Sequence, residues 1–164
     1  DIPAIAGLLG EIAKLRPVVL HVIGDGESRV QFIEAVQAAG AKVIFHGIVY
    51  DSAQKQKIFD QCSFGINMMK SSVCVGLTMK SLDYFAGGLP ILNSIGGDTH
   101  ELVEKRKIGW NVCRSDLYQT AVLAAQASPE ENLRMRENTL RMFRELFSEE
   151  AFRKQLQQSI GHTV

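Results

Sequence analysis

Short apolar runs alternate along this chain with longer amphipathic segments, and this alternation limits the possible folds more than any other feature. Residues 17–24 (PVVLHVIG) are almost wholly apolar and end in Gly-Asp-Gly, which is typical of a parallel strand buried on both faces. Residues 28–39 then place Val30, Ile33 and Val36 at helical spacing. Four more runs of strand length follow, at residues 41–49, 63–69, 89–93 and 108–113.

The order of these segments predicts an α/β fold. Strands separated by helices favour a doubly wound, open parallel sheet of about five to six strands, similar to one Rossmann-like half. After residue 113 only helical patterns remain, and Ser128-Pro129 is a strong helix start. We therefore expect one domain over residues 1–148 and a separate C-terminal helix over residues 149–164.

Composition excludes several classes of protein. Lys and Arg total 18, as do Asp and Glu, and this balance argues against a nucleic-acid partner. No apolar run has the length of a membrane span. The three cysteines lack the spacing of metal ligands, so we expect no metal site, and free thiols point to a reducing, cytoplasmic location. The chain starts at Asp1 within what reads as a helix, which suggests a piece of a longer protein.

Loops at the carboxyl ends of the strands are the expected place for a ligand. The loop Gly24-Asp25-Gly26 permits a tight turn and precedes a helix N-terminus, which can bind an anion. The third glycine of a dinucleotide fingerprint is absent, because Arg29 stands in its place. The sequence also contains no Gly-Lys-Ser/Thr, so neither an NAD domain nor a P-loop is expected.

Four segments in order resemble the C-terminal domain of family 4 glycosyltransferases, which have the GT-B architecture. They are the Gly-Asp-Gly strand end at 22–28, Phe-x-Gly-x-Val at 45–49, the helix end and Gly-x-Pro at 83–90, and the Gly-Gly loop at 96–103. The resemblance covers essentially the whole chain. It implies a donor-binding domain for a nucleoside-diphosphate sugar, with no other cofactor.

Roles for individual residues follow from this resemblance. Asp83 would accept hydrogen bonds from ribose hydroxyls, Lys80 and the helix start at 77–79 would hold the diphosphate, and the turn at 47–50 would contact the base. The family has an acid at the position of Val75, so recognition of the sugar must differ here. The donor-binding positions implied are Gly24, Gly26, Gly47, Val49, Tyr50, Gly76, Leu77, Thr78, Met79, Lys80 and Asp83.

The resemblance also implies an activity and partners. The parent enzyme would transfer a sugar with retention of configuration to a saccharide or lipid-linked acceptor, in polysaccharide or cell-envelope glycan synthesis. The acceptor site and the base would lie on a preceding N-terminal domain, to which the last helix would cross, so we expect this chain alone to be inactive. No catalytic residue is assigned within it.

Alternative interpretations remain open at this point. The chain could be a non-catalytic nucleotide-sugar-binding module, a GT-B nucleotide-sugar epimerase domain, or a doubly wound interaction domain without a ligand. A row of arginines in the helical tail favours a solvated face, with Glu130–Arg134 and Glu137–Arg141 as ion pairs. Its alternative partner is an anionic membrane surface on the cytoplasmic side. The row is Arg134, Arg136, Arg141 and Arg144.

Overall fold

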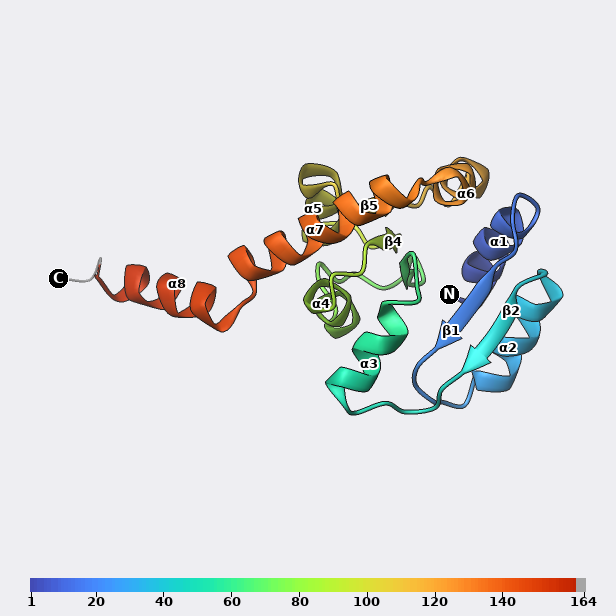
Figure 1. Ribbon diagram of the computed structural model, residues 1–164, viewed down its shortest axis with the longest axis horizontal. Coiled ribbons are helices and arrows are strands. Elements are labelled where there is room, and N and C mark those ends of the chain that lie inside the picture. Colours follow the sequence, from blue (N-terminus) through green and yellow to red (C-terminus); the bar gives the residue numbers. More distant parts are fainter. Residues whose placement is uncertain (162–164) are drawn as a thin grey trace.

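The computed structural model describes residues 1–161 and has the predicted α/β class and helical tail (Figure 1). Its strands are β1 (Val19–Val22), β2 (Lys42–Phe45), β3 (Gly65–Asn67), β4 (Ile91–Asn93) and β5 (Gly109–Asn111). Helices precede, separate and follow them. They are α1 (Ile2–Ala13), α2 (Arg29–Ala38), α3 (Ser52–Phe59), α4 (Met79–Ala86), α5 (Asp98–Arg106), α6 (Leu117–Gln126), α7 (Pro129–Leu146) and α8 (Glu149–Gly161).

Side-chain caps fix where several helices begin. The Asp51 carboxylate caps α3 and the Ser128 hydroxyl caps α7, as their sequence context predicts. Asp1 is the N-cap of α1, because its carboxylate accepts a hydrogen bond of 3.3 Å from the amide of Ala4. The expectation that the chain starts inside a helix is therefore wrong, since α1 begins at Ile2.

The five strands form two parallel sheets instead of one. Strand β1 pairs with β2, with Val19 opposite Lys42, and β4 lies between β3 and β5. Within residues 1–161, no backbone hydrogen bond joins β1 to β3. The sheet predicted as continuous is thus interrupted at one place, between the facing edges of these two strands. A cavity lined by both strands lies there.

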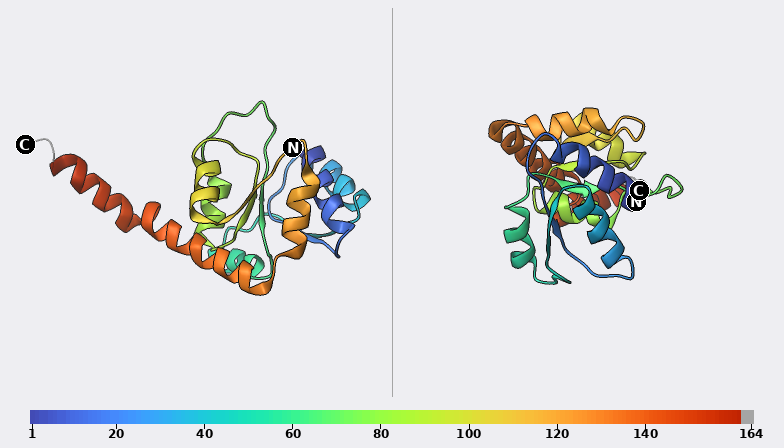
Figure 2. Two further views of the ribbon diagram at one scale, coloured as in Figure 1. Left: turned by 90° about the horizontal axis from the view of Figure 1, so that it is seen from above. Right: turned by 90° about the vertical axis from the view of Figure 1, so that its right-hand side faces the viewer.

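Two apolar clusters make up the core. The first packs α1, α2 and α6 against strands of both sheets, so the two sheets share one apolar layer. The second packs α4, α5 and α7 around β4 and β5. Helix α8 leads away from this body at the end of α7 (Figure 2). The fully buried members include Leu8, Val36, Phe85, Ile91 and Ile108.

Helix α7 is fastened to the body through one of the arginines expected in its solvated row. The Arg136 guanidinium donates to the carbonyl of Phe59 at 2.9 Å and to that of Cys62. Among the described residues the two predicted glutamate–arginine pairs do not form, and Arg141 instead donates to Asn138. The four arginines therefore do not form one solvated face, because Arg136 binds the body of the protein. None of the helices in residues 1–161 combines the length and apolar character needed to cross a bilayer.

Candidate functional site

A cavity of about 540 Å3 is lined by residues that belong to or follow strands of both sheets. Its lining includes Gly24 after β1, Val49 after β2, and Lys80 and Asp83 on the first turns of α4. These four predicted positions come from segments far apart in the sequence, yet they share one cavity. The fold therefore brings together glycine loops, a cation and a carboxylate, which is the combination that the sequence predicted at this place.

The two glycine loops are joined by a hydrogen bond. The amide of Gly24 donates to the carbonyl of Gly47 at 2.7 Å. Both glycines have positive φ, 121° and 68°, which other residues adopt only with strain. Gly26 and Tyr50 do not line the cavity, and Tyr50 is 88% exposed. Gly47 does not line the cavity either, so Gly24 is the one of these four residues that does.

Helix α4 presents its N-terminus toward this end of the sheets. The Thr78 hydroxyl caps it by accepting from the amide of Ser81 at 3.1 Å. Within the described part of the chain, no protein group accepts from the amides of Met79 and Lys80. Two free donors and the positive end of the helix dipole are what an anion such as a diphosphate requires. The Met79 side chain itself is exposed.

A row of three asparagines, two of them fully buried, supports this helix start. Asn67, Asn93 and Asn111 end the three neighbouring strands in register. The Asn67 amide donates to Asn93 at 2.9 Å and to the Ser81 hydroxyl at 3.0 Å, and Asn93 donates to Asn111 at 2.9 Å. These side chains link the sheet to the first turn of α4. These asparagines were not among the predicted site residues, although each strand pattern (GIN, ILN, GWN) ends in the same residue.

The loop before α4 is held from the opposite side. The carbonyl of Gly76 accepts from the amide of Thr99 at 3.0 Å and also from its hydroxyl, at the N-terminus of α5. The next residue, Leu77, packs on the second apolar cluster. Gly76 and Leu77 therefore position the start of α4 and do not line the cavity. Val75 is half-buried and brings no carboxylate, as its sequence departure implies.

Asp83 already has a partner that sequence reasoning missed. Lys55 on α3 donates to its carboxylate at 2.9 Å, and the Asp83 side chain is 53% exposed. A ribose hydroxyl would have to share or displace this ammonium group. Behind it, burial raises the pKa of Tyr84, whose neutral hydroxyl donates to the Ile66 carbonyl at 3.4 Å. The pair is 28 residues apart, so no local spacing could reveal it.

The comparisons with known proteins decide the family. A family model described as glycosyl transferases group 1 matches residues 3–128 of the 164. The chain belongs to the group 1 glycosyltransferases. No curated protein and no solved structure matches this chain. Membership in a transferase family supports glycosyl transfer in general terms, and the matched residues contain every predicted site position.

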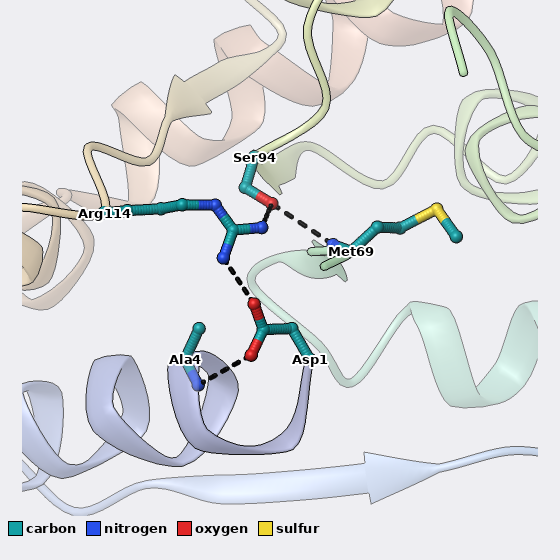
Figure 3. Close-up of polar contacts among 5 residues, drawn as sticks. All are labelled: Asp1, Ala4, Met69, Ser94 and Arg114. Carbon is teal, nitrogen blue, oxygen red and sulfur yellow. Dashed lines mark hydrogen bonds and ion pairs between the residues drawn. The ribbon is translucent and has the colours of Figure 1, made fainter. Parts of the chain in front are cut away.

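Cations gather beside the site of this group 1 glycosyltransferase. Arg114 forms an ion pair with Asp1 and donates to the Ser94 hydroxyl at 3.2 Å (Figure 3). Lys70 follows β3, Lys80 lies on the first turn of α4, and Arg114 follows β5. Positive charge therefore converges where the strands end. Across the described residues, no group of three His, Cys, Asp or Glu side chains is placed to hold a metal ion.

Proposed function

We propose that this chain is the donor-binding half of a retaining, GT-B glycosyltransferase of family 4, and that it binds a nucleoside-diphosphate sugar. One observation carries the proposal: Gly24, Val49, Lys80 and Asp83 line one cavity, and Lys80 lies at the N-terminus of α4. Membership in the group 1 family agrees with it. The proposed substrate supplies the anion, the ribose and the base that these groups would meet.

Each part of the donor has a complementary group in this arrangement. The diphosphate would lie against the amides of Met79 and Lys80, with the Lys80 ammonium group alongside. Positive charge at this place stabilises the negative charge that grows on the departing diphosphate during transfer. The ribose hydroxyls would bind Asp83 in competition with Lys55, and the backbone at Gly47 and Val49 would face the base.

The C-terminal helix supports a two-domain arrangement. Helix α8 leads away from the body, and Phe152 on it is 61% exposed. We assign residues 1–148 to donor binding, and we propose that the C-terminal helix crosses to an acceptor-binding domain. This helix was predicted over residues 149–164, of which 162–164 lie outside the described residues. The acceptor would be a saccharide or a lipid-linked sugar of the cell envelope, at the cytoplasmic face of the membrane. The chain alone would bind nucleotide without transferring sugar.

Calorimetric titration with UDP, GDP and ADP tests the donor site. We expect saturable binding of one of these diphosphates, and a loss of roughly tenfold in affinity in both Asp83→Ala and Lys80→Ala, because each removes a charge-assisted contact. Matched controls are Asp60→Ala at the end of α3 and Lys42→Ala at the start of β2, which should bind as the unaltered chain does. Equal affinity in all four variants would refute the proposed site.

Val75 favours a second candidate, a nucleotide-sugar-binding module without transferase activity. The family's acid at this position contacts the sugar, and the half-buried valine cannot. Introducing Val75→Glu into the full-length protein separates the two candidates. Faster sugar transfer in the variant would favour an active enzyme with relaxed sugar recognition. Nucleotide binding without transfer, in both proteins and with a range of donors, would favour the module.

A further inference from the structure

The three asparagines at the strand ends form a chain of hydrogen bonds that runs between two helices. The side-chain amide of Asn111 donates to the carbonyl of His100 at 3.1 Å, in the first turn of α5. The oxygen of Asn111 accepts from Asn93, and that of Asn93 accepts from Asn67. Asn67 also donates to the hydroxyl of Ser81 in the first turn of α4. The chain of bonds therefore joins the N-terminal turn of α5 to that of α4.

The orientation of these amide groups is set at the middle of the row. An asparagine side chain can donate two hydrogen bonds and accept two, and Asn93 uses all four. Two of its bonds go to the neighbouring asparagines. The other two join it to the backbone of Ile95, whose carbonyl accepts at 2.8 Å and whose amide donates at 3.2 Å. The backbone of Ile95 therefore fixes the orientation of Asn93, and Asn93 fixes that of its two neighbours.

At α4 the row ends on two hydroxyl groups. The Thr78 hydroxyl donates to the oxygen of Asn67 at 3.4 Å and lies 2.8 Å from the Ser81 hydroxyl. The Ser81 amide donates to the Thr78 oxygen at 3.1 Å. Because Asn67 and Ser81 are fully buried, these groups bond to one another and not to solvent. The helix start therefore presents its backbone to a ligand, through the amides of Met79 and Lys80.

A second connection joins the same two helices through the loop before α4. Thr99, the second residue of α5, is fully buried and donates to the carbonyl of Gly76 through its amide at 3.0 Å and through its hydroxyl. The segments lie so close that a Cβ atom on Gly76 would be 3.3 Å from the Asp98 carboxylate. The start of α4 is thus attached to α5 at two places, and two attachments fix its direction as well as its position.

A fixed direction matters where backbone amides bind an anion. Groups of a binding site work best when rigid neighbours hold them within about 0.5 Å of the productive geometry. A helix start that moved freely would lose that freedom on binding, and the loss would weaken the affinity. The side chains of Met79 and Lys80 are exposed, so they cannot hold their own amides by packing. The asparagine row supplies the support that these side chains do not.

We propose that the asparagine row positions the amides of Met79 and Lys80 for the diphosphate of the donor. Asn67 is the positioning residue that contacts α4, and Asn93 is the one that orients Asn67. This role rests on the proposed donor site and deepens it, because it assigns part of the affinity for phosphate to side chains that do not touch the ligand. The row is neutral, so it holds the amides without the repulsion that a carboxylate at the same place would exert on a diphosphate.

Amide hydrogen exchange followed by NMR, without nucleotide, tests whether the row holds the helix start. The amides of Ser81 and Leu82 bond within the first turn of α4, and that of Gly87 bonds at its far end. In Asn67→Ala the first two should exchange at least roughly tenfold faster, and the third at its former rate. Asn138→Ala on α7 removes side-chain bonds outside the row and should change none of them. Equal change at all three amides in Asn67→Ala, or no change, would overturn the proposal.

Asn111→Ala is the milder variant and decides if Asn67→Ala does not fold. Asn111 is only half-buried and has no bond to α4, so its replacement removes the anchor of the row on α5 alone. If the row acts as one unit, exchange at Ser81 and Leu82 should still rise by roughly threefold. Rates equal to those of the unaltered chain would overturn the proposal, because the anchor on α5 would then not reach α4.

Calorimetric titration with a nucleoside diphosphate and its nucleoside separates positioning from a merely structural role. The pairs are UDP with uridine, GDP with guanosine and ADP with adenosine. In Asn67→Ala the diphosphate should bind roughly tenfold more weakly and the nucleoside less than about twofold more weakly, because only the phosphates meet the α4 amides. A loss of stability alone would leave both affinities of the folded protein unchanged, and a distorted cavity would weaken both alike. Either result would overturn the proposal.

The unaltered chain distinguishes this failure from a failure of the proposed function. If it bound none of the three diphosphates, the donor site would be refuted, and the role of the row with it. If the unaltered chain and Asn67→Ala bound the same diphosphate with equal affinity, the donor site would stand and the role of the row alone would be refuted. Asn138→Ala should bind both members of the pair as the unaltered chain does.

Discussion

The two sheets of this group 1 glycosyltransferase differ in how completely their strands are enclosed. Every residue of β4 is buried, and it has a strand on each side. No residue of β1 is fully buried; it has one strand partner, and Val19 is 49% exposed. Both sheets are parallel and use similar apolar residues. The difference shows that the environment of a strand depends on its neighbours as much as on its own sequence.

The three-stranded sheet is also the one whose strand ends are joined by polar side chains, two of which are fully buried. Asn67, Asn93 and Asn111 link β3, β4 and β5 with geometry that leaves no described buried side-chain polar atom unpaired. The two-stranded sheet has a histidine pair at the comparable place, His21 and His46, which is only partly buried. We therefore expect substitutions in the three-stranded sheet to cost more stability than substitutions in the two-stranded sheet.

The largest effect is expected for Gly109→Ala in β5. A Cβ atom there would lie 1.9 Å from the carbonyl oxygen of Ile91, and φ is 137°. Backbone cannot yield as a flexible side chain can, so we expect a loss of at least about 4 kcal/mol, or no folded protein. Gly26→Ala, after β1, meets nothing within 4 Å and should change stability by less than about 0.5 kcal/mol. Urea unfolding measures both, and similar losses would contradict the comparison.

Asn93→Leu comes next. The side chain of Asn93 is fully buried and also bonds the backbone of Ile95. Its loss removes an acceptor from the Asn67 amide group and the donor to the Asn111 side-chain oxygen. We expect destabilisation by about 3 kcal/mol in urea unfolding. Asn138→Leu on α7 removes two exposed bonds of 3.3 Å, one to the carbonyl of Lys107 and one from Arg141, and should cost below about 1 kcal/mol. A smaller effect at Asn93 than at Asn138 would show that the asparagine row is dispensable.

Sequence patterns predicted the helices and strands better than they predicted which strands pair with each other. The strand ends, the caps at Asp51 and Ser128 and the buried Met68 are encoded locally, within a few residues. The interruption between β1 and β3 is not, because an apolar strand looks the same whether one or both of its edges are paired. A single sheet was predicted from the number of strands, on the assumption that each strand pairs with a strand beside it.

In the candidate site, too, residues marked by a local motif were predicted, and residues brought together only by the fold were missed. Gly24, Val49, Lys80 and Asp83 were predicted because family motifs mark them, and they line one cavity. The asparagine row was missed because an asparagine after an apolar run is also typical of a turn. Lys55 was missed because its partner lies on another helix, and only the fold brings the two together.

The histidine pair gives the two-stranded sheet a dependence on pH. His21 Nδ1 lies 3.0 Å from His46 Nε2, and burial, then the charge of His46, lowers the pKa of His21. The unfolded chain therefore binds more protons, so stability is full above about pH 6.5 and falls as pH drops through the lower pKa of the folded state. Urea unfolding at pH 7 and pH 5 should show this fall, and His46→Gln should reduce it.

A control histidine lies outside both sheets. His100 on α5 is exposed and contacts Glu104 at 3.1 Å. His100→Gln should leave the loss of stability between pH 7 and pH 5 close to that of the unaltered chain. If His46→Gln and His100→Gln change it equally, the pair between β1 and β2 is not its source.

The smallest change in stability is expected for Lys55→Gln, which nevertheless tests the site most directly. The Lys55–Asp83 pair joins α3 to α4, and its side chains are 25% and 53% exposed, so solvent screens the pair and its loss should cost less than about 1 kcal/mol. The ligand for this test is a nucleoside, because it has no phosphates that Lys55 could attract. If Asp83 accepts the ribose hydroxyls, freeing its carboxylate should raise nucleoside affinity roughly threefold, as seen in NMR titrations. Lys57→Gln, exposed on the same helix, should change nothing. An unchanged affinity in Lys55→Gln would mean that Asp83 serves the contact between α3 and α4 and not the ribose.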